Sequence, residues 1–266
     1  MKQFNSPFAE GSASARAAGV RSLLIACVIT FALYFIPYAG YVTYPIRILV
    51  TFIHEGAHAL MALLTGSTVD AIAVMPNGSG VTLSRTPIGP AGWLPNMLIS
   101  SAGYLGATLY GAILVWMLRR GMEGRKLLLM TGIAVALVTL GAVKGLAWPP
   151  AWVAGASPFG LMFALFWGVL LTAGLLIGAK KLPRDGANWL ASFVGVQCVL
   201  NALFDLRTLF DLSVGTSAHT DARNMEALTL LPAPIWAALW IVMSLAILLF
   251  VLRPERASRR SAVAIR

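Results

Sequence analysis

Residues 51–66 read TFIHEGAHALMALLTG, and most of this stretch has the apolar composition of a membrane helix. It nevertheless contains three ionisable side chains within five positions, His54, Glu55 and His58. Such groups are costly inside a bilayer, and where they occur there they are usually functional. The stretch therefore raises the question of whether the chain lies in a membrane and what these three residues do.

The composition of the whole chain indicates a membrane protein. Of its 266 residues, 58% are hydrophobic and only 11% are charged, and the mean hydropathy is +0.79. A soluble domain carries about 25% charged residues. The net charge of +10 comes from basic residues that cluster between apolar runs, which is typical of cytoplasmic edges that face anionic lipid. We therefore expect a lipid bilayer as a partner and no nucleic acid.

The order of apolar and polar segments predicts an all-α polytopic membrane protein. We expect a polar N-terminal arm at 1–19, a transmembrane domain at 20–252 and a basic tail at 253–266. Each expected span is long enough to cross roughly 30 Å of hydrocarbon at about 1.5 Å per residue. About seven such spans are predicted, at 22–41, 44–64, 97–118, 127–146, 159–179, 187–209 and 234–252.

The basic segments leave the membrane topology open. Those at 119–126, 180–184 and 253–260 should all be cytoplasmic, and they agree with one another by helix parity. Seven full crossings would then put the N-terminus outside, although it carries Lys2, Arg16 and Arg21. Either one early element does not fully cross, or this weak N-terminal signal is overridden.

Residues 69–85 alternate between polar and apolar side chains on both sides of the dipeptide Asn77-Gly78. Such a dipeptide between alternating runs is a strong signal for a β-hairpin. We therefore predict a small hairpin directly after the span that contains His54, with an ordinary connecting loop as the alternative. Because an isolated hairpin is only marginally stable in water, it should rest on the membrane domain.

His54, Glu55 and His58 form the pattern H-E-x-x-H. Residues four apart share a face of a helix, so both imidazoles can reach one metal ion. Zinc lowers the pKa of a bound water to about 7, and a neighbouring glutamate can take its proton and later pass it to a leaving amine. The motif predicts one zinc ion per chain, with Glu55 as the catalytic base. The alternative is a polar helix face or proton relay that happens to match the pattern.

A catalytic zinc needs a third protein ligand, and Asp205 is the first candidate. Gln197, Asn201 and Asp205 are spaced four apart, so they lie on one face of an otherwise apolar helix. We expect this face to point into the bundle, with Asp205 as the ligand and Asn201 orienting it or binding substrate backbone. Alternatively, the stripe only joins helices.

The second candidate for the third ligand is Asp221, in the segment 218–236. It can bind the metal or support a ligating histidine. The pair Thr220-Asp221 also has the pattern of a helix N-cap. His219 and Glu226, in the same segment, are further alternatives.

Three segments, HEGAHALMALLTG (54–66), VMPNGSGVTL (74–83) and TDARNMEALTLLPAPIWAALW (220–240), resemble the site-2 protease family of intramembrane zinc metalloproteases, in particular its compact bacterial branch without a PDZ domain. The resemblance covers about 44–106 and 197–240. It implies that two histidines of one span and an aspartate of a later span hold zinc within the membrane. His54, Glu55 and His58 match directly. Where better-known members have an L-D-G triplet, this chain has NALFDL (201–206), so Asn201 and Asp205 would take those parts.

The resemblance also implies a function. The chain would be a zinc-dependent intramembrane endopeptidase of the bacterial inner membrane, with a membrane-spanning protein as substrate, such as an anti-sigma factor or a signal-peptide remnant. The hairpin would hold the unwound substrate by strand addition, which makes Val81 and Leu83 candidate substrate-positioning residues. The alternatives are a non-proteolytic metal-binding membrane protein and a transporter with a His/Glu/Asp relay.

Overall fold

A computed structural model describes residues 21–30, 32–33, 35–87, 89–147, 156–215 and 220–252. The expected N-terminal arm, the basic tail and His219 lie outside these residues. The described elements are α2 (Ala39–Leu64), β1 (Thr68–Val74), β2 (Gly80–Arg85), α3 (Pro90–Arg119), α4 (Gly124–Ala147), α6 (Pro158–Lys181), α7 (Arg184–Gly215), α8 (Asp221–Thr229) and α9 (Ala233–Leu252).

Six helices of the described part are long and apolar enough to cross a membrane, namely α2, α3, α4, α6, α7 and α9. The prediction of about seven spans is therefore not confirmed. In the first apolar run, residues 21–30 form a helix too short to be counted. The chain then turns through Tyr38, whose φ of 65° is left-handed, directly after Pro37, and α2 begins at Ala39. The residue before a proline is disfavoured in the α conformation, which explains why a single helix does not continue through this run.

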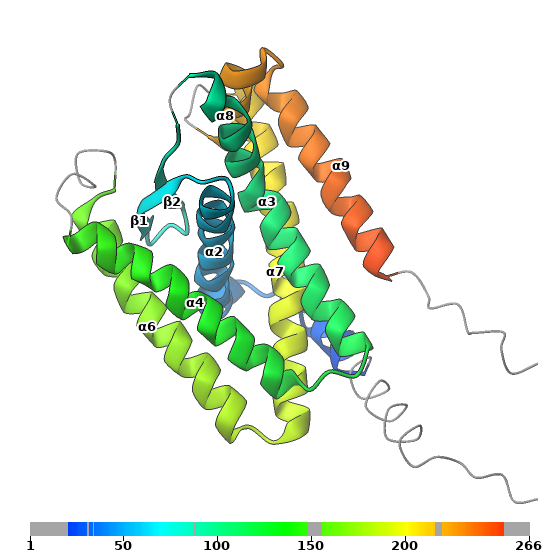
Figure 1. Cartoon of the computed structure of the whole chain (residues 1–266). Helices are drawn as coiled ribbons and strands as arrows, with labels where there is room; N and C mark the ends of the chain where they lie inside the picture. Colours follow the sequence, from blue (N-terminus) through cyan, green and yellow to red (C-terminus); the bar gives the residue numbers. More distant parts are fainter. Residues whose placement is uncertain are drawn as a thin grey trace, which may run out of the picture.

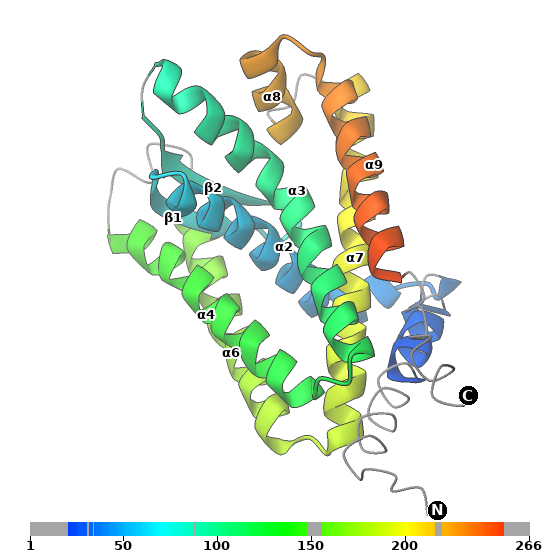
Figure 2. The same cartoon turned by 45° about the vertical axis from the view of Figure 1, so that its right-hand side comes forward.

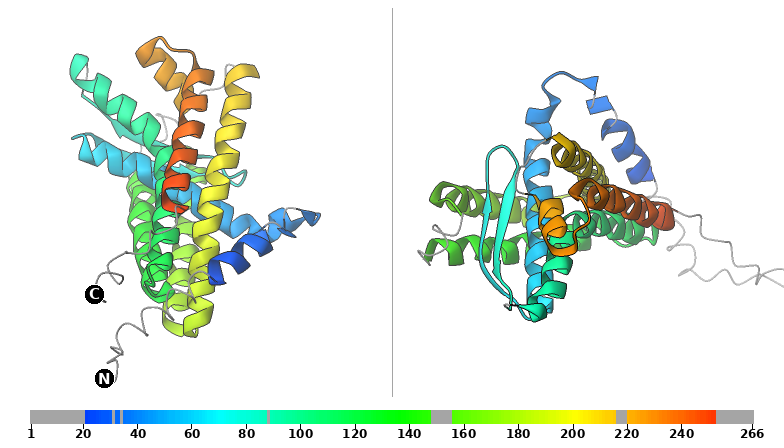
Figure 3. Two further views of the ribbon diagram at one scale, coloured as in Figure 1. Left: turned by 90° about the vertical axis from the view of Figure 1, so that its right-hand side faces the viewer. Right: turned by 90° about the horizontal axis from the view of Figure 1, so that it is seen from above.

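The helices form two groups with α2 between them. Helix α4 packs along α6 on one flank, and α3 packs against α7 and α9 on the other. Helix α2 contacts helices of both groups and crosses the molecule obliquely (Figures 2 and 3). The motif helix is therefore the element that both halves of the bundle share.

Small residues let α2 approach its neighbours closely. A Cβ atom added at Gly56 would stand 2.6 Å from Val138 Cγ2 on α4, and one added at Gly106 on α3 would stand 2.5 Å from Ala57 Cβ. At each point a side chain of one helix packs directly on the glycine backbone of the other, as is common between membrane helices. By contrast, the outer side of the bundle is apolar, with Phe250 of α9 70% exposed, as expected for a surface that faces lipid.

The predicted β-hairpin is present. Strands β1 and β2 pair antiparallel, with Ala73 opposite Val81 and Ile72 opposite Thr82. The turn between them closes with a hydrogen bond from Gly78 N to Met75 O, and Gly78 has a φ of 86°, a conformation that favours glycine. β1 lies against α4 and α6, and β2 lies over α2. The hairpin therefore rests on the membrane helices and covers the helix that contains the motif.

Candidate metal centre

The two motif histidines converge on one point. His54 and His58 follow each other by one turn of α2, and their Nε2 atoms lie 3.1 Å apart. His58 is buried, and its Nδ1 donates a hydrogen bond of 2.6 Å to the carbonyl oxygen of Ile99 on α3. This bond fixes the ring and leaves Nε2 as the nitrogen that faces His54. A hydrogen bond at the other ring nitrogen is how proteins orient a histidine that binds metal.

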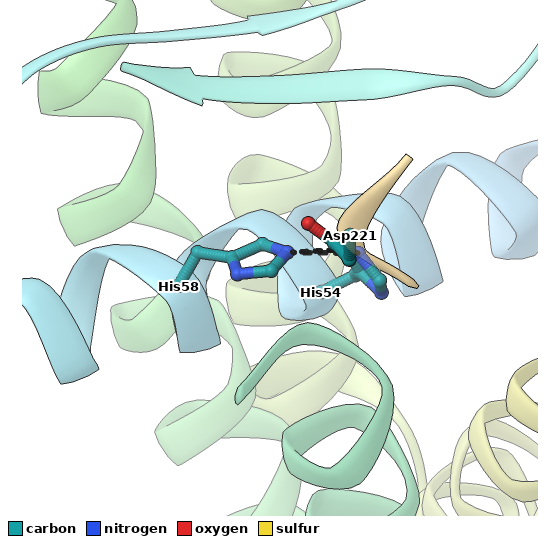
Figure 4. Close-up of side chains that lie close together, drawn as sticks. All are labelled: His54, His58 and Asp221. Atoms are coloured by element: carbon teal, nitrogen blue, oxygen red, sulfur yellow. Dashed lines mark hydrogen bonds and ion pairs between the residues drawn. The ribbon is translucent and has the colours of Figure 1, made fainter. Parts of the chain in front are cut away.

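Asp221 completes a group of three ligand atoms. It is the first residue of α8, whose N-cap, Thr220, accepts a hydrogen bond from Arg223 N. Asp221 Oδ2 lies 3.6 Å from His54 Nε2 and 3.3 Å from His58 Nε2, and all three ligand atoms lie within 4.8 Å of one another. Figure 4 shows the carboxylate of Asp221 beside the imidazoles of α2. Two imidazole nitrogens and one carboxylate oxygen are a donor set that zinc accepts in catalytic sites, where a fourth position stays open.

The space at these atoms fits a metal ion. A Cβ atom added at Gly103 of α3 would collide with Nε2 of both histidines and stand 2.6 Å from His54 Cε1. The glycine therefore leaves the ring nitrogens uncovered on the side of α3. The space beside Gly103 and the spacing of the three ligand atoms together suit a small cation.

The electrostatics at Asp221 also favour a cation. Burial raises the pKa of the Asp221 carboxyl. The charge of His58 and hydrogen bonds with both histidines lower it by more, so the pKa lies below its ordinary value. The ionised carboxylate attracts positive charge to the imidazole nitrogens. A metal ion at this point would replace a proton there, since metal binding to histidines releases protons.

Asp205, the first candidate for the third ligand, does not belong to this group. It lies on an exposed face of α7, whereas the three clustered ligand atoms come from α2 and α8. Its neighbour Asn201 donates hydrogen bonds to the carbonyl and the side chain of Gln197 on the same helix. Gln197 in turn donates to Thr30 Oγ1 in the helix that precedes α2. The polar stripe of α7 thus contacts the first helix, and Asn201 bonds within α7.

Glu55 is buried beside the histidines, with 3% of its surface exposed. Its Oε2 accepts a hydrogen bond of 2.7 Å from Thr82 Oγ1 on β2, and its Oε1 lies against Gly80 of the same strand. A buried carboxylate needs such a donor because an unpaired buried charge is very costly. The Glu55 carboxylate is thus held between its own helix and the hairpin.

His54 is supported from the other side of the site by aromatic rings. Tyr104 of α3 meets the His54 ring edge to face at 4.6 Å between centroids. Trp240 of α9 stacks on Tyr104 at 5.6 Å. These contacts connect α9 to the motif helix, although α9 provides no polar atom to the site.

Sequence reasoning missed three residues that the structure places at the site, Gly80, Thr82 and Gly103. The alternation of β2 indicated that Gly80 and Thr82 share one face of the strand, but no pattern showed that this face meets Glu55. Gly103 looked like an ordinary packing glycine among many in the spans. The two strand residues lie more than 20 positions from the motif, so only tertiary packing brings them there.

Val81 and Leu83, the residues expected to position substrate, lie on the other face of β2. They pack, partly buried, against a small apolar cluster formed by Ala71, Ala73, Ala156 and Leu161. Their side chains therefore help to hold the hairpin on α6 and the segment before it.

Comparison with known proteins agrees with this arrangement. The model of the family described as Peptidase M50B-like matches residues 24–251. No curated protein and no solved structure matches the chain. The matched region contains the whole H-E-x-x-H motif, the hairpin and α8 with Asp221. Since the match spans most of its length, the chain belongs to the Peptidase M50B-like family, which is the site-2 protease family.

Proposed function

We propose that the protein is a zinc-dependent intramembrane endopeptidase that hydrolyses peptide bonds in or near transmembrane segments of other membrane proteins. One observation carries the proposal. The two histidines of the H-E-x-x-H helix and Asp221 bring their ligand atoms within 4.8 Å of one another, and the buried carboxylate of Glu55 lies next to them. Membership of a metallopeptidase family supports the same conclusion.

Each residue of the site has a role in this proposal. His54, His58 and Asp221 hold the ion. Bound zinc supplies a water of lowered pKa and polarises the carbonyl of the peptide bond to be cut. Glu55 accepts the proton of that water at its carboxylate and passes it to the nitrogen of the leaving amine. A structural metal site needs no such base, so Glu55 favours the catalytic over the non-proteolytic alternative.

The free edge of β2 is the place where we propose that the substrate binds. In an antiparallel pair, successive residues alternate between facing the partner strand and facing away. The bond from Met75 N to Ser79 O at the turn sets this alternation, so the backbone groups of Gly80 and Thr82 face away from β1. An unwound substrate can pair with this edge directly beside Glu55, while Val81 and Leu83 keep the strand in place by their packing.

We also propose that the site opens toward the non-cytoplasmic face. The basic segment at 119–126 connects the C-terminal end of α3 to α4, and the one at 180–184 connects α6 to the N-terminal end of α7. The metal centre lies toward the opposite ends, since His58 bonds to Ile99 near the start of α3 and Asp221 follows the end of α7. Figure 1 shows α8 and the α6–α7 turn at opposite ends of the molecule. Because basic loops stay in the cytoplasm, the site would lie in the outer half of a plasma membrane.

Six crossings also resolve the parity problem in the sequence. With six spans, Ala39 and the end of α9 lie on the same side as the basic loops. If the helix at 21–30 does not cross, Lys2, Arg16 and Arg21 are cytoplasmic as well. We therefore propose a multi-pass protein of the bacterial inner membrane with its N-terminus inside.

The proposal is tested by measuring zinc content and cleavage together on wild type, Glu55→Gln and His58→Ala. The substrates are a panel of single-span membrane proteins in liposomes. We expect about one zinc per chain in wild type and Glu55→Gln, cleavage by wild type alone, and loss of zinc in His58→Ala. Zinc binding with no cleavage that depends on Glu55 would favour a non-proteolytic metal protein. Absence of zinc from wild type would favour the alternative of a transporter with a His/Glu/Asp relay.

A further inference from the structure

We propose that Thr82 of β2 is a positioning residue for the general base, so that the hairpin is part of the catalytic assembly as well as a platform for substrate. This inference rests on the proposed function, because it assigns a partner to Glu55 in that reaction. It concerns a residue 27 positions away from Glu55, on a different element.

Thr82 contacts both the side-chain carboxylate and the backbone carbonyl of Glu55 directly. Thr82 Oγ1 lies 2.7 Å from Glu55 Oε2 and 3.0 Å from the Glu55 carbonyl oxygen. A hydroxyl has one proton to donate, and the shorter distance assigns it to the carboxylate. Hydrogen bonds to an ionised group are about twice as strong as neutral ones, so this bond can hold the carboxylate in one rotamer.

The bond gives the two carboxylate oxygens of Glu55 different surroundings and different roles. Oε2 is occupied by Thr82, and Oε1 faces the backbone of Gly80, where a Cβ atom would also approach Glu55 Cδ to 2.8 Å. Within the described part of the chain no hydrogen bond to Oε1 is found, so we assign to Oε1 the transfer of the proton from water to the leaving nitrogen. A base fixed in this way needs no reorganisation at the moment of reaction.

A second set of contacts makes the hairpin rigid enough for this role. Three side chains of α2, spaced along the face that leads to Glu55, bind the carbonyl oxygens of the hairpin turn. Tyr44 OH donates to Pro76 O at 2.7 Å, Arg47 donates to Asn77 O, and Thr51 Oγ1 donates to Gly78 O at 2.8 Å. The turn and β2 are thereby fixed to the same helix that carries the base.

The test compares Thr82→Val, Thr82→Ser and the control Thr68→Val. Valine has the shape of threonine without the donor, and serine keeps the donor. Thr68 is an exposed residue of β1, opposite Arg85, so its replacement measures the effect of the same substitution on the hairpin itself, away from the proposed substrate edge. Each variant is purified and measured for zinc content, melting temperature, kcat and KM with the substrate that wild type cleaves.

We expect Thr82→Val to lower kcat about 10- to 100-fold, because a small misplacement of a catalytic group has effects of this size. KM, zinc content and melting temperature should stay near their wild-type values. Thr82→Ser should recover kcat to within about threefold of wild type, and Thr68→Val should behave as wild type. Equal kcat in Thr82→Val and wild type overturns the inference, and so does a loss of zinc or of melting temperature that accounts for the lost activity.

Failure of the proposed function gives a different result. In that case wild type either cleaves nothing or cleaves as well as Glu55→Gln does, and both proposals are wrong. If wild type cleaves and Glu55→Gln does not, the function stands, and the serine and valine variants decide the role of Thr82 alone.

Discussion

Gly103 of α3 lies directly against the ring of His58. A Cβ atom at this glycine would collide with Nε2 of both motif histidines, although 45 residues of chain separate Gly103 from His58. The absence of a side chain at this one position keeps open the space in which the ligand atoms of α2 meet Asp221.

Replacement of Gly103 by alanine should therefore remove the metal without unfolding the protein. We expect the added methyl group to weaken zinc affinity about 100-fold. This is as large as the greatest effect of removing a residue that hydrogen-bonds to a metal ligand. Gly174→Ala is the matched control, since it also lies in a membrane helix but has no atom within 4 Å of an added Cβ. Metal analysis and melting curves of both variants check this, and normal zinc content in Gly103→Ala would contradict the proposed metal site.

The choice between the two aspartates can be decided by their separate replacement. Asp221→Asn should weaken zinc binding by more than about 100-fold, because loss of a direct ligand costs more than loss of a supporting group. Asp205→Asn should keep about one zinc per chain, since Asp205 lies on the exposed face of α7. Titration of each apoprotein with zinc gives both affinities. The opposite order would assign the third ligand to Asp205.

Removal of zinc with a chelator should lower the stability of the wild type. A ligand that binds only the folded state stabilises it by about 2.7 kcal/mol when its free concentration is a hundred times Kd. Glu55→Gln keeps all three ligands and should respond in the same way, whereas His58→Ala should show no response. Thermal melts with and without chelator measure this. A chelator effect of equal size in His58→Ala would indicate zinc bound elsewhere.

Gly80→Ala should impair the base and leave the metal in place. The added methyl group would press on the Glu55 carboxylate, with Cδ 2.8 Å away, and we expect kcat to fall at least about tenfold. Zinc content should not change, because the three atoms nearest the added methyl group all belong to Glu55 and none to a proposed metal ligand. Ser79→Ala, one residue earlier in the turn, serves as the control. Unchanged kcat in Gly80→Ala would mean that the carboxylate does not need this position.

The orientation of the protein can be measured by cysteine labelling. In a variant without Cys27 and Cys198, we expect Ser79→Cys in the hairpin turn to react with a membrane-impermeant maleimide added to intact cells. Met122→Cys, in the loop between α3 and α4, should react only after the cells are opened. Labelling in the reverse order would place the metal centre on the cytoplasmic side.

Local interactions account for what could be predicted from the sequence. The pairing of His54 with His58 follows from the helical repeat, since side chains four apart share a face. The hairpin follows from Asn77-Gly78, which favours a tight turn between alternating runs. Six of the spans follow from the length of their apolar runs. In the first run, length alone predicted a span, but the left-handed turn at Tyr38 interrupts it.

Long-range packing decided the rest of the site. Asp205 and Asp221 were both plausible ligands from sequence, because each is a carboxylate near an apolar helix. The position of α8 brings Asp221 rather than Asp205 to the two histidines. Helix α8 is held by Trp93 Nε1, which donates to Leu228 O, and by Trp236 Nε1, which donates to Thr229 Oγ1. The contacts of Glu55 with Thr82 and of Gly103 with the histidines arise in the same way. The sequence by itself thus determined the motif and the shared face of its histidines, while the carboxylate that joins them and the residues around Glu55 depend on contacts between distant segments, which no local pattern encodes.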